Sequence, residues 1–260
     1  MATKPRQKKF QTGLVQPIRI VPMHRPEVAS APVAQAAPRL TYRNGPLLTA
    51  AQVFTIFWGS AWQQPPQSDF VPRINQFFDF ILTSALLDQL AEYSVPGKQI
   101  GHGKRIGTTT LTTPEPGKSV QDNAIQKMLQ EEISAGATLP APTPNTLYFV
   151  MLPPGVQVIQ GGGTSCKVFC GYHDAIKGHI FYAVMPYPGC RGCTDGLSVF
   201  DALTSTTSHE LCEAITDPIP GQGWYDDNNG EIGDICEWKT RSLGGYTIQL
   251  EWLNKAGSCV

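Results

Sequence analysis

Charged side chains are scarce in this chain, and long apolar runs are missing. Only 16% of its 260 residues are Asp, Glu, Lys or Arg, and the formal net charge is −1. A net charge near zero gives no reason to expect nucleic acid as a partner, because that binding depends on an excess of basic residues. No apolar run approaches the ~20 residues that a membrane-spanning helix needs, so we expect no membrane span.

The basic residues that do occur are concentrated near the start of the chain. Residues 1–40 combine them with many Pro and Ala and have no sustained periodicity, so we predict a flexible arm with one short strand around Val15–Val21. Residues 41–260 are predicted to form a single α+β domain of catalytic type. A tail that binds an acidic partner is the alternative reading of the arm. The basic residues noted in it are Lys4, Arg6, Lys8, Lys9, Arg19 and Arg25.

All seven cysteines lie in the C-terminal half of the chain. This density favours disulfides and a secreted or extracellular location. The N-terminus nevertheless lacks the 7–15-residue apolar core of a secretory signal, so we expect no recognisable signal peptide. A bridge from Cys236 to Cys259 would join the chain end to the segment after residue 230. Four others are expected to form a structural zinc knot, two disulfides, or one disulfide with free thiols. Cys212 is expected to be a buried apolar residue. Those four are Cys166, Cys170, Cys190 and Cys193.

Hydrophobic periodicity predicts an α+β fold, with a mixed β-sheet packed against helices and a smaller lobe after the last helix. Strands are expected at Gln52–Trp58, 107–113, Leu147–Leu152, His179–Met185 and Tyr246–Leu253. Helices are expected at Asp69–Tyr93 and Val120–Ser134, and a third that begins somewhere within Ser198–Thr206 and ends at about Thr216. Ser198 and Asp201 have the spacing of a capping box for the last helix, which Pro218 ends.

That last helix carries the most informative motif, Ser208-His-Glu-Leu-Cys-Glu213. His209 and Glu213 are four residues apart and therefore project from one helical face, about 200° from the apolar Leu211. The spacing matches a zinc helix in which two side chains hold Zn²⁺ and the intervening glutamate acts as general base. We therefore predict His209 and Glu213 as metal ligands and Glu210 as the base.

The third ligand has several candidates. Glu231 and Asp234 are three residues apart, so one could bind the metal while the other orients His209. Asp217 lies on the same helical face as His209 and competes for either role, although an Asp before Pro is commonly a turn former. The motif favours Glu231 or Asp234 and does not rank those two.

The same residues carry a family resemblance. The run from Ser208 to Pro218, then Gly223-Trp-Tyr225, then Glu231 to Cys236 is similar to the signature region of the EXORDIUM/phosphate-induced protein family, in its bacterial-type form. The resemblance is sharp over 208–236 and extends over about 44–260. Plant members are extracellular proteins linked to growth, and they typically have Asn where Asp217 stands, which speaks against Asp217 as a ligand.

A second resemblance is to the gluzincin branch of zincin metallopeptidases. It rests on His209, Glu210 and Glu213, with Glu231 or Asp234 downstream; those peptidases have His where Glu213 stands. It implies a zincin-like fold and a zinc metallopeptidase that cleaves a peptide or protein substrate through metal-activated water. An anionic ligand set also suits another divalent cation, such as Mn²⁺ or Ca²⁺. The alternative is a non-catalytic extracellular binding or signalling protein. In it, the same residues would form a structural metal site or a hydrogen-bonded cluster.

Overall fold

A computed structural model describes residues 20–24 and 37–260 of the protein. Its centre is a six-stranded mixed sheet with the order β1-β9-β10-β6-β3-β4. The four strands from β10 to β4 run parallel, and β9 and β1 add antiparallel pairs at one edge. The strands of this sheet are β1 (Ile20–Pro22), β3 (Gln52–Trp58), β4 (Lys104–Leu111), β6 (Thr146–Met151), β9 (Phe169–Ile176) and β10 (Ile180–Met185).

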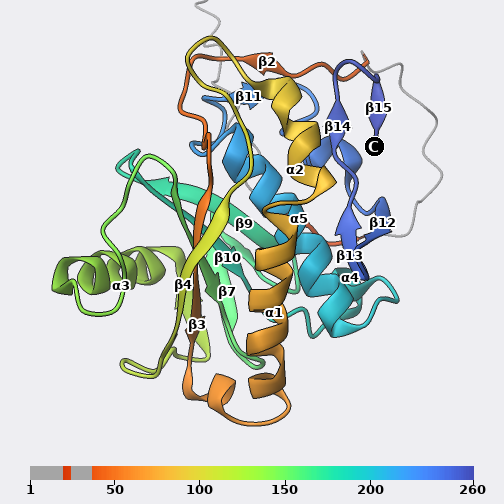
Figure 1. The fold of residues 1–260 in the computed structure, drawn as a ribbon. Coiled ribbons are helices and arrows are strands. Elements are labelled where there is room, and N and C mark those ends of the chain that lie inside the picture. The colour runs from red at the N-terminus through yellow and green to blue at the C-terminus, as the bar shows by residue number, and fades with distance from the viewer. Residues whose placement is uncertain (1–19, 25–36) are drawn as a thin grey trace, which may run out of the picture.

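Helices cover both faces of this sheet. Helices α1, α2 and α5 lie on one face and α3 lies on the other (Figure 1). The helices are α1 (Gln67–Ile81), α2 (Ala85–Leu90), α3 (Asp122–Ala135), α4 (Arg191–Thr194) and α5 (Val199–Thr216), with 3-10 turns η1 (Ser60–Gln63), η2 (Ala91–Tyr93) and η3 (Asp234–Cys236). The predicted α+β class is confirmed.

The two cores follow from the alternation of side chains along the central strands. In β6, Leu147 and Phe149 point into the core under α1, α2 and α5, whereas Tyr148 and Val150 point into the core under α3. Because successive residues of a strand face opposite sides, a strand covered on both faces must be apolar throughout. Every residue of β6 is buried, as that argument requires.

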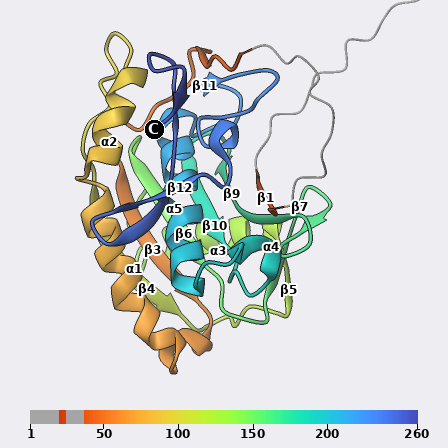
Figure 2. The same cartoon turned by 90° about the vertical axis from the view of Figure 1, so that its right-hand side faces the viewer.

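Short sheets complete the structure on both sides of the main sheet. Figure 2 shows the chain after α5 lying against that helix on the side away from the main sheet. The strands outside the main sheet are β2 (Thr41–Tyr42), β5 (Ser119–Gln121), β7 (Gln157–Gln160), β8 (Gly163–Thr164), β11 (Trp224–Tyr225), β12 (Thr240–Leu243), β13 (Tyr246–Gln249), β14 (Trp252–Leu253) and β15 (Ser258–Cys259). They form the pairs β11-β2, β12-β13 and β14-β15 and the triplet β5-β7-β8. The β12-β13 pair packs on α5, and the β5-β7-β8 triplet packs on α3.

Two predicted elements are divided in the structure. The helix expected over Asp69–Tyr93 begins at Gln67 rather than at an Asp69 cap, and it stops at Ile81 before α2. Ser84 causes the break: its hydroxyl donates to the Ile81 carbonyl at 2.8 Å and accepts from Leu86 N at 3.3 Å. Such local bonds compete with helix continuation.

The strand expected over Tyr246–Leu253 is also two strands, β13 and β14. The backbone changes partners between them, since Leu250 N donates to Lys239 O at 2.7 Å while Glu251 N donates to Val260 O at 3.3 Å. The predicted arm over 1–40 is only partly described. Residues 15–19 of its expected strand lie outside the described residues, whereas Ile20 and Val21 belong to β1, paired with β9.

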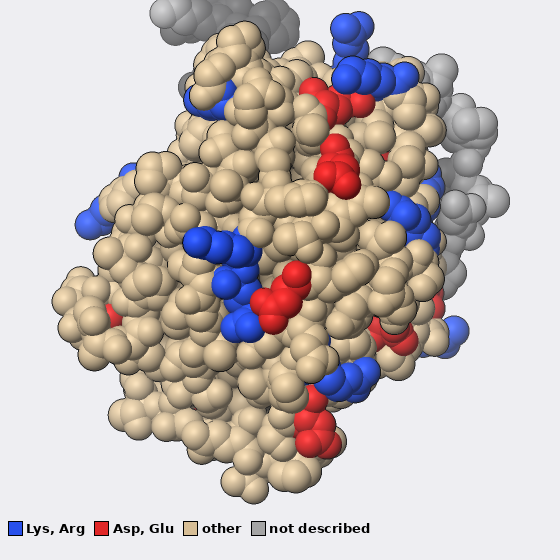
Figure 3. Space-filling view, viewed as in Figure 1, with Lys and Arg blue, Asp and Glu red and all other residues tan. Residues whose placement is uncertain are grey.

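None of the described helices has the length and apolar character of a membrane span. The face shown in Figure 3 carries Lys and Arg groups interspersed with Asp and Glu, without a broad patch of one sign.

Candidate metal centre

Helix α5 carries the predicted motif and is buried almost throughout its length. Its N-cap is the expected one, since Ser198 Oγ accepts from Asp201 N at 3.2 Å. Every residue from Ala202 to Thr216 is buried. Polar residues tolerate this because they bond to backbone: Thr204 Oγ1, for example, donates to Thr247 O at 2.7 Å.

The first half of the site lies between α5 and the chain after it. His209 Nε2 and Glu213 Oε1 are 2.9 Å apart, one helical turn from each other as the motif predicts. Asp234 completes a group in which each residue offers a ligand atom within 4.8 Å of the others. On the other side of the imidazole, Gln249 Nε2 lies 2.7 Å from His209 Nδ1 and also donates to Gly233 O at 3.0 Å. Gln249 therefore fixes the ring orientation.

The second half is built around His173 on strand β9, which lies next to the edge strand β1. Its Nδ1 is 3.1 Å from Glu210 Oε2 and 3.6 Å from Glu213 Oε2. Its Nε2 lies 3.1 Å from the Asp217 carbonyl oxygen and 3.5 Å from Glu231 Oε1. His173, Glu210 and Glu213 form a second group with ligand atoms within 4.8 Å of one another. Glu213 thus belongs to both halves.

Burial controls the protonation of these groups. Burial raises the pKa of Glu210, Glu231 and Asp234, because a charged carboxylate loses its water there. Burial likewise raises the pKa of Glu213 to about 8, although the charge of His173 opposes it. For His173, burial acts to lower the pKa, but Glu231 and Glu210 outweigh it and the pKa lies well above its ordinary value.

Several carboxylate oxygens of the cluster have no hydrogen-bond donor among the described residues. They are Glu210 Oε1, both oxygens of Glu231 and Asp234 Oδ1. A buried acceptor without a donor costs roughly 1–3 kcal/mol, and more if charged. Imidazole nitrogens and carboxylate oxygens are ligands of Zn²⁺, and the carboxylates also suit harder cations such as Mn²⁺. The residues therefore fit a divalent cation.

The structure separates the three candidates for the third ligand. Asp234 lies with His209 and Glu213, whereas Glu231 faces His173 instead. The Asp217 carboxylate accepts from the backbone N–H groups of Gly221, Gln222 and Gly223, so it organises the loop after α5 as a turn former.

Three features of the site differ from the sequence-based picture. Neither His173 nor Gln249 is among the site residues that the sequence predicts. Glu210 Oε2 is turned to His173 rather than left free. The His209 face is turned from the apolar core but is wholly buried, because η3 and β13 cover it.

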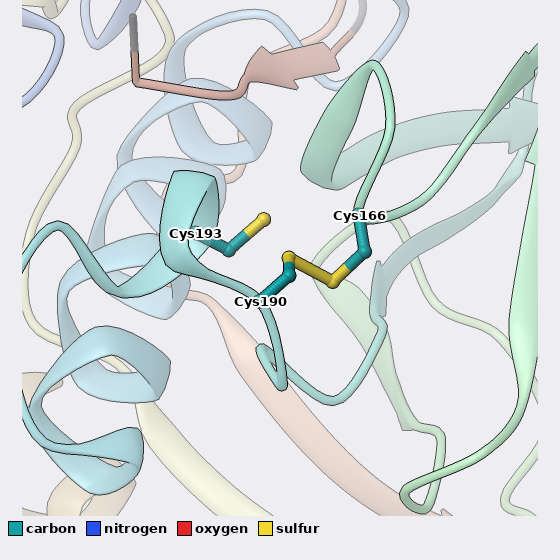
Figure 4. Close-up of side chains that lie close together, drawn as sticks. All are labelled: Cys166, Cys190 and Cys193. Carbon is teal, nitrogen blue, oxygen red and sulfur yellow. A yellow bond between two sulfur atoms is a disulfide. The ribbon is translucent and has the colours of Figure 1, made fainter. Parts of the chain in front are cut away.

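The six paired cysteines are disulfide-bonded and hold no zinc knot. Cys236–Cys259 is confirmed, with sulfurs 2.06 Å apart, and it ties η3 to the last strand. Figure 4 shows the Cys166–Cys190 bridge beside Cys193, whose own partner is Cys170. Cys212 is a free thiol buried within α5, as expected.

No protein-family model matches this chain, and no curated protein or solved structure matches it either. The arrangement of the cluster itself is therefore what bears on function.

Proposed function

We propose that this protein is a metal-dependent hydrolase, of the zinc metallopeptidase type, with the cation held by His209, Glu213 and Asp234. The observation that carries the proposal is the convergence of these three ligand atoms within 4.8 Å at a buried point. His209 and Glu213 come from one helical face, and Asp234 comes from a segment 21 residues after Glu213 in the chain. The proposal adopts Asp234 rather than Glu231 as the third ligand.

The charge of the cluster supports a bound cation. Among the described residues, the ion pairs of Glu210, Glu213 and Glu231 are all made with histidines. Buried carboxylates that are ionised need a hydrogen-bonded partner of opposite charge or a metal, because the desolvation of an unpaired charge is very costly. Two imidazoles do not balance this many acids, so a divalent cation is the natural counter-charge.

Glu210 is the general base in this proposal. It follows His209 directly on α5, and its Oε1 has no hydrogen-bond partner in the described part of the chain. His173 holds the other oxygen at 3.1 Å and so orients the carboxylate. A bound divalent cation supplies Lewis-acid polarisation and makes water a better nucleophile at neutral pH. Burial raises the pKa of Glu210, which brings a carboxylate closer to the range useful for accepting a proton near neutral pH.

The three disulfides support a secreted or extracellular location, because such bridges persist in oxidising compartments. Membership of the EXORDIUM/phosphate-induced family, suggested by residues 208–236, stays a prediction, as does a zincin-like fold.

A second candidate is a binding protein in which the cation is structural. It is favoured by burial: the side chains of His209, Glu210, Glu213 and Glu231 are no more than 2% exposed. A catalytic site keeps one coordination position open, whereas a structural site is closed by protein groups. The structure has a cavity of about 510 Å³ whose lining includes Leu47, Lys98 and Pro142. None of the candidate metal ligands lines this cavity, which agrees with a closed site.

The test combines elemental mass spectrometry with a peptidase assay on the full chain, prepared with zinc. We expect bound zinc in the wild type and loss of the cation held by His209, Glu213 and Asp234 in His209→Ala. Glu210→Gln should keep that cation and lower kcat by about 10²–10⁴-fold. Metal without activity in the wild type would favour the structural candidate, and a wild type without metal would overturn both.

Matched controls come from exposed residues of the same types. His102→Ala removes a surface histidine that pairs with Asp88 at 2.8 Å, and Glu131→Gln removes a surface carboxylate near Lys127. Both should retain the metal content and activity of the wild type. If they lost metal as His209→Ala does, the loss could not be assigned to the proposed ligand.

A further inference from the structure

We infer that the cluster holds two divalent cations bridged by Glu213, the second one bound by His173, Glu210 and Glu213. This inference rests on the proposed function, because it places a second cation beside the one held by His209. It assigns His173 as a metal ligand and gives Glu210 a ligand role when both cations are bound.

The two oxygens of Glu213 are directed to the two histidines. Oε1 lies 2.9 Å from His209 Nε2, and Oε2 lies 3.6 Å from His173 Nδ1. Two-metal sites in hydrolases have their ions about 3.5–4 Å apart. A carboxylate that offers one oxygen to each of two ligand sets is suited to bridging ions at that spacing.

His173 is held with one nitrogen ready to bind a cation. Its Nε2 is 3.1 Å from the Asp217 carbonyl oxygen, which can only accept, so Nε2 carries a proton. In the metal-free protein Nδ1 also carries a proton, which faces Glu210 and Glu213. A cation that displaces this proton would meet the Nδ1 lone pair and both carboxylates. A metal-binding histidine usually donates its other N–H to a carbonyl or carboxylate in this way. Glu231, 3.5 Å from Nε2, is a positioning residue on the same side.

The third ligand, Glu210, is completely buried, and one of its oxygens has no hydrogen-bond partner within residues 20–24 and 37–260. Gly171 on β9 makes room for it: a Cβ at that position would lie 3.0 Å from Glu210 Oε1 and 2.8 Å from Thr206 Cγ2. The strand that carries His173 therefore approaches α5 closely at the point where the second cation is proposed.

Charge balance favours two ions over one. Glu210, Glu213, Glu231 and Asp234 together carry four formal negative charges when ionised, and the buried Glu251 beside them adds a fifth. Two divalent cations neutralise four of these charges. A single divalent cation bound by His209, which is neutral as a ligand, would leave three negative charges to His173 in a buried site, where uncompensated charge is costly.

The test is the metal stoichiometry of the full-length protein, stripped with a chelator and then titrated with Zn²⁺ or Mn²⁺. We expect close to two equivalents for the wild type and close to one for His173→Ala and Glu210→Gln. His209→Ala and Asp234→Asn should also keep about one, at the other position. Glu231→Gln should weaken the second site by roughly 10–100-fold, because it removes the carboxylate charge that lies 3.5 Å from His173 Nε2.

A measurement on the wild type alone guards against variants that fail to fold. Two Mn²⁺ ions bridged by one carboxylate should couple magnetically, so electron paramagnetic resonance should show loss of the isolated six-line signal as the second equivalent binds. One equivalent of metal with an uncoupled signal would overturn the second site and leave the proposed function standing. No bound metal at all would overturn both.

Discussion

His173 on β9 lies 3.1 Å from Glu210 on α5, although the two residues are 37 positions apart in the chain. This contact joins the main sheet to the helix that carries His209 and Glu213. It also places a histidine beside the glutamate that the motif alone presents as a free base. The contact depends on close packing of β9 against α5. A substitution that pushes these two elements apart should therefore disturb it.

Gly171→Ala should destabilise the protein by about 1–3 kcal/mol, the usual cost of overpacking a core. The added methyl would lie 2.8 Å from Thr206 Cγ2 and 3.0 Å from Glu210 Oε1. Urea unfolding measures the change. Gly117→Ala is the matched control, since its nearest neighbour is 3.6 Å away. Equal stabilities for the two variants would contradict close packing at Gly171.

The metal-free protein should lose stability as the pH rises from about 5 towards 8. Burial raises the pKa of Glu213 from the ordinary value of 4.5 to about 8, so over this interval the folded state keeps a proton that the unfolded state releases. The free energy of unfolding then falls by up to about 1.4 kcal/mol per pH unit. The raised pKa values of His173, Glu231 and Asp234 act in the same direction.

Chemical unfolding of chelator-treated protein at several pH values measures this slope. Glu213→Gln should reduce it, because the amide does not titrate. Added Zn²⁺ should oppose it, since cations bind deprotonated ligands. A stability that rises over the same interval in the metal-free protein would show that the cluster is ionised without a cation.

Asp217→Ala should cost about 2–4 kcal/mol of stability while leaving the metal stoichiometry unchanged. Its carboxylate accepts from Gly221 N at 2.6 Å and from Gln222 N at 3.0 Å, and also from Gly223 N. Removing it leaves donors without their acceptor at a partly buried turn. Thermal unfolding and elemental analysis are the measurements, with the exposed Asp227→Ala as the control. Loss of metal by a well-folded Asp217→Ala would restore Asp217 as a ligand candidate.

Two disulfides allow a matched comparison. Cys236–Cys259 closes a separation of 23 residues and Cys166–Cys190 one of 24, so removing either should cost a similar ~3 kcal/mol through the entropy of the unfolded chain. Only the first lies next to the cluster, because η3 contains both Asp234 and Cys236.

Paired Cys→Ser variants of each bridge should therefore differ in metal affinity more than in stability. Isothermal titration with Zn²⁺ should show weaker binding for Cys236→Ser/Cys259→Ser and near wild-type binding for Cys166→Ser/Cys190→Ser. If both variants bound zinc equally well, the Cys236–Cys259 bridge would have no part in holding Asp234.

The sequence by itself determined the local half of the site. The spacing of His209 and Glu213 places them on one face of any helix that contains them, and the structure finds them 2.9 Å apart. The Ser198–Asp201 cap and the apolar runs of the central strands are equally local, because they depend on helical and strand periodicity. The Cys236–Cys259 bridge was also anticipated from the positions of its cysteines.

Only the tertiary structure decided the other half. Strand β9 was not expected, since Gly171, His173 and Asp174 interrupt its apolar pattern, and its place comes from pairing with β10 and β1. That pairing brings His173 to Glu210, while the turn held by Asp217 and the fold of η3 bring Asp234, rather than Glu231, to His209. The spacing of residues in the sequence defines which side chains share a face of one helix or strand. Which elements meet is set by the burial of their apolar faces against one another, a property of the whole chain.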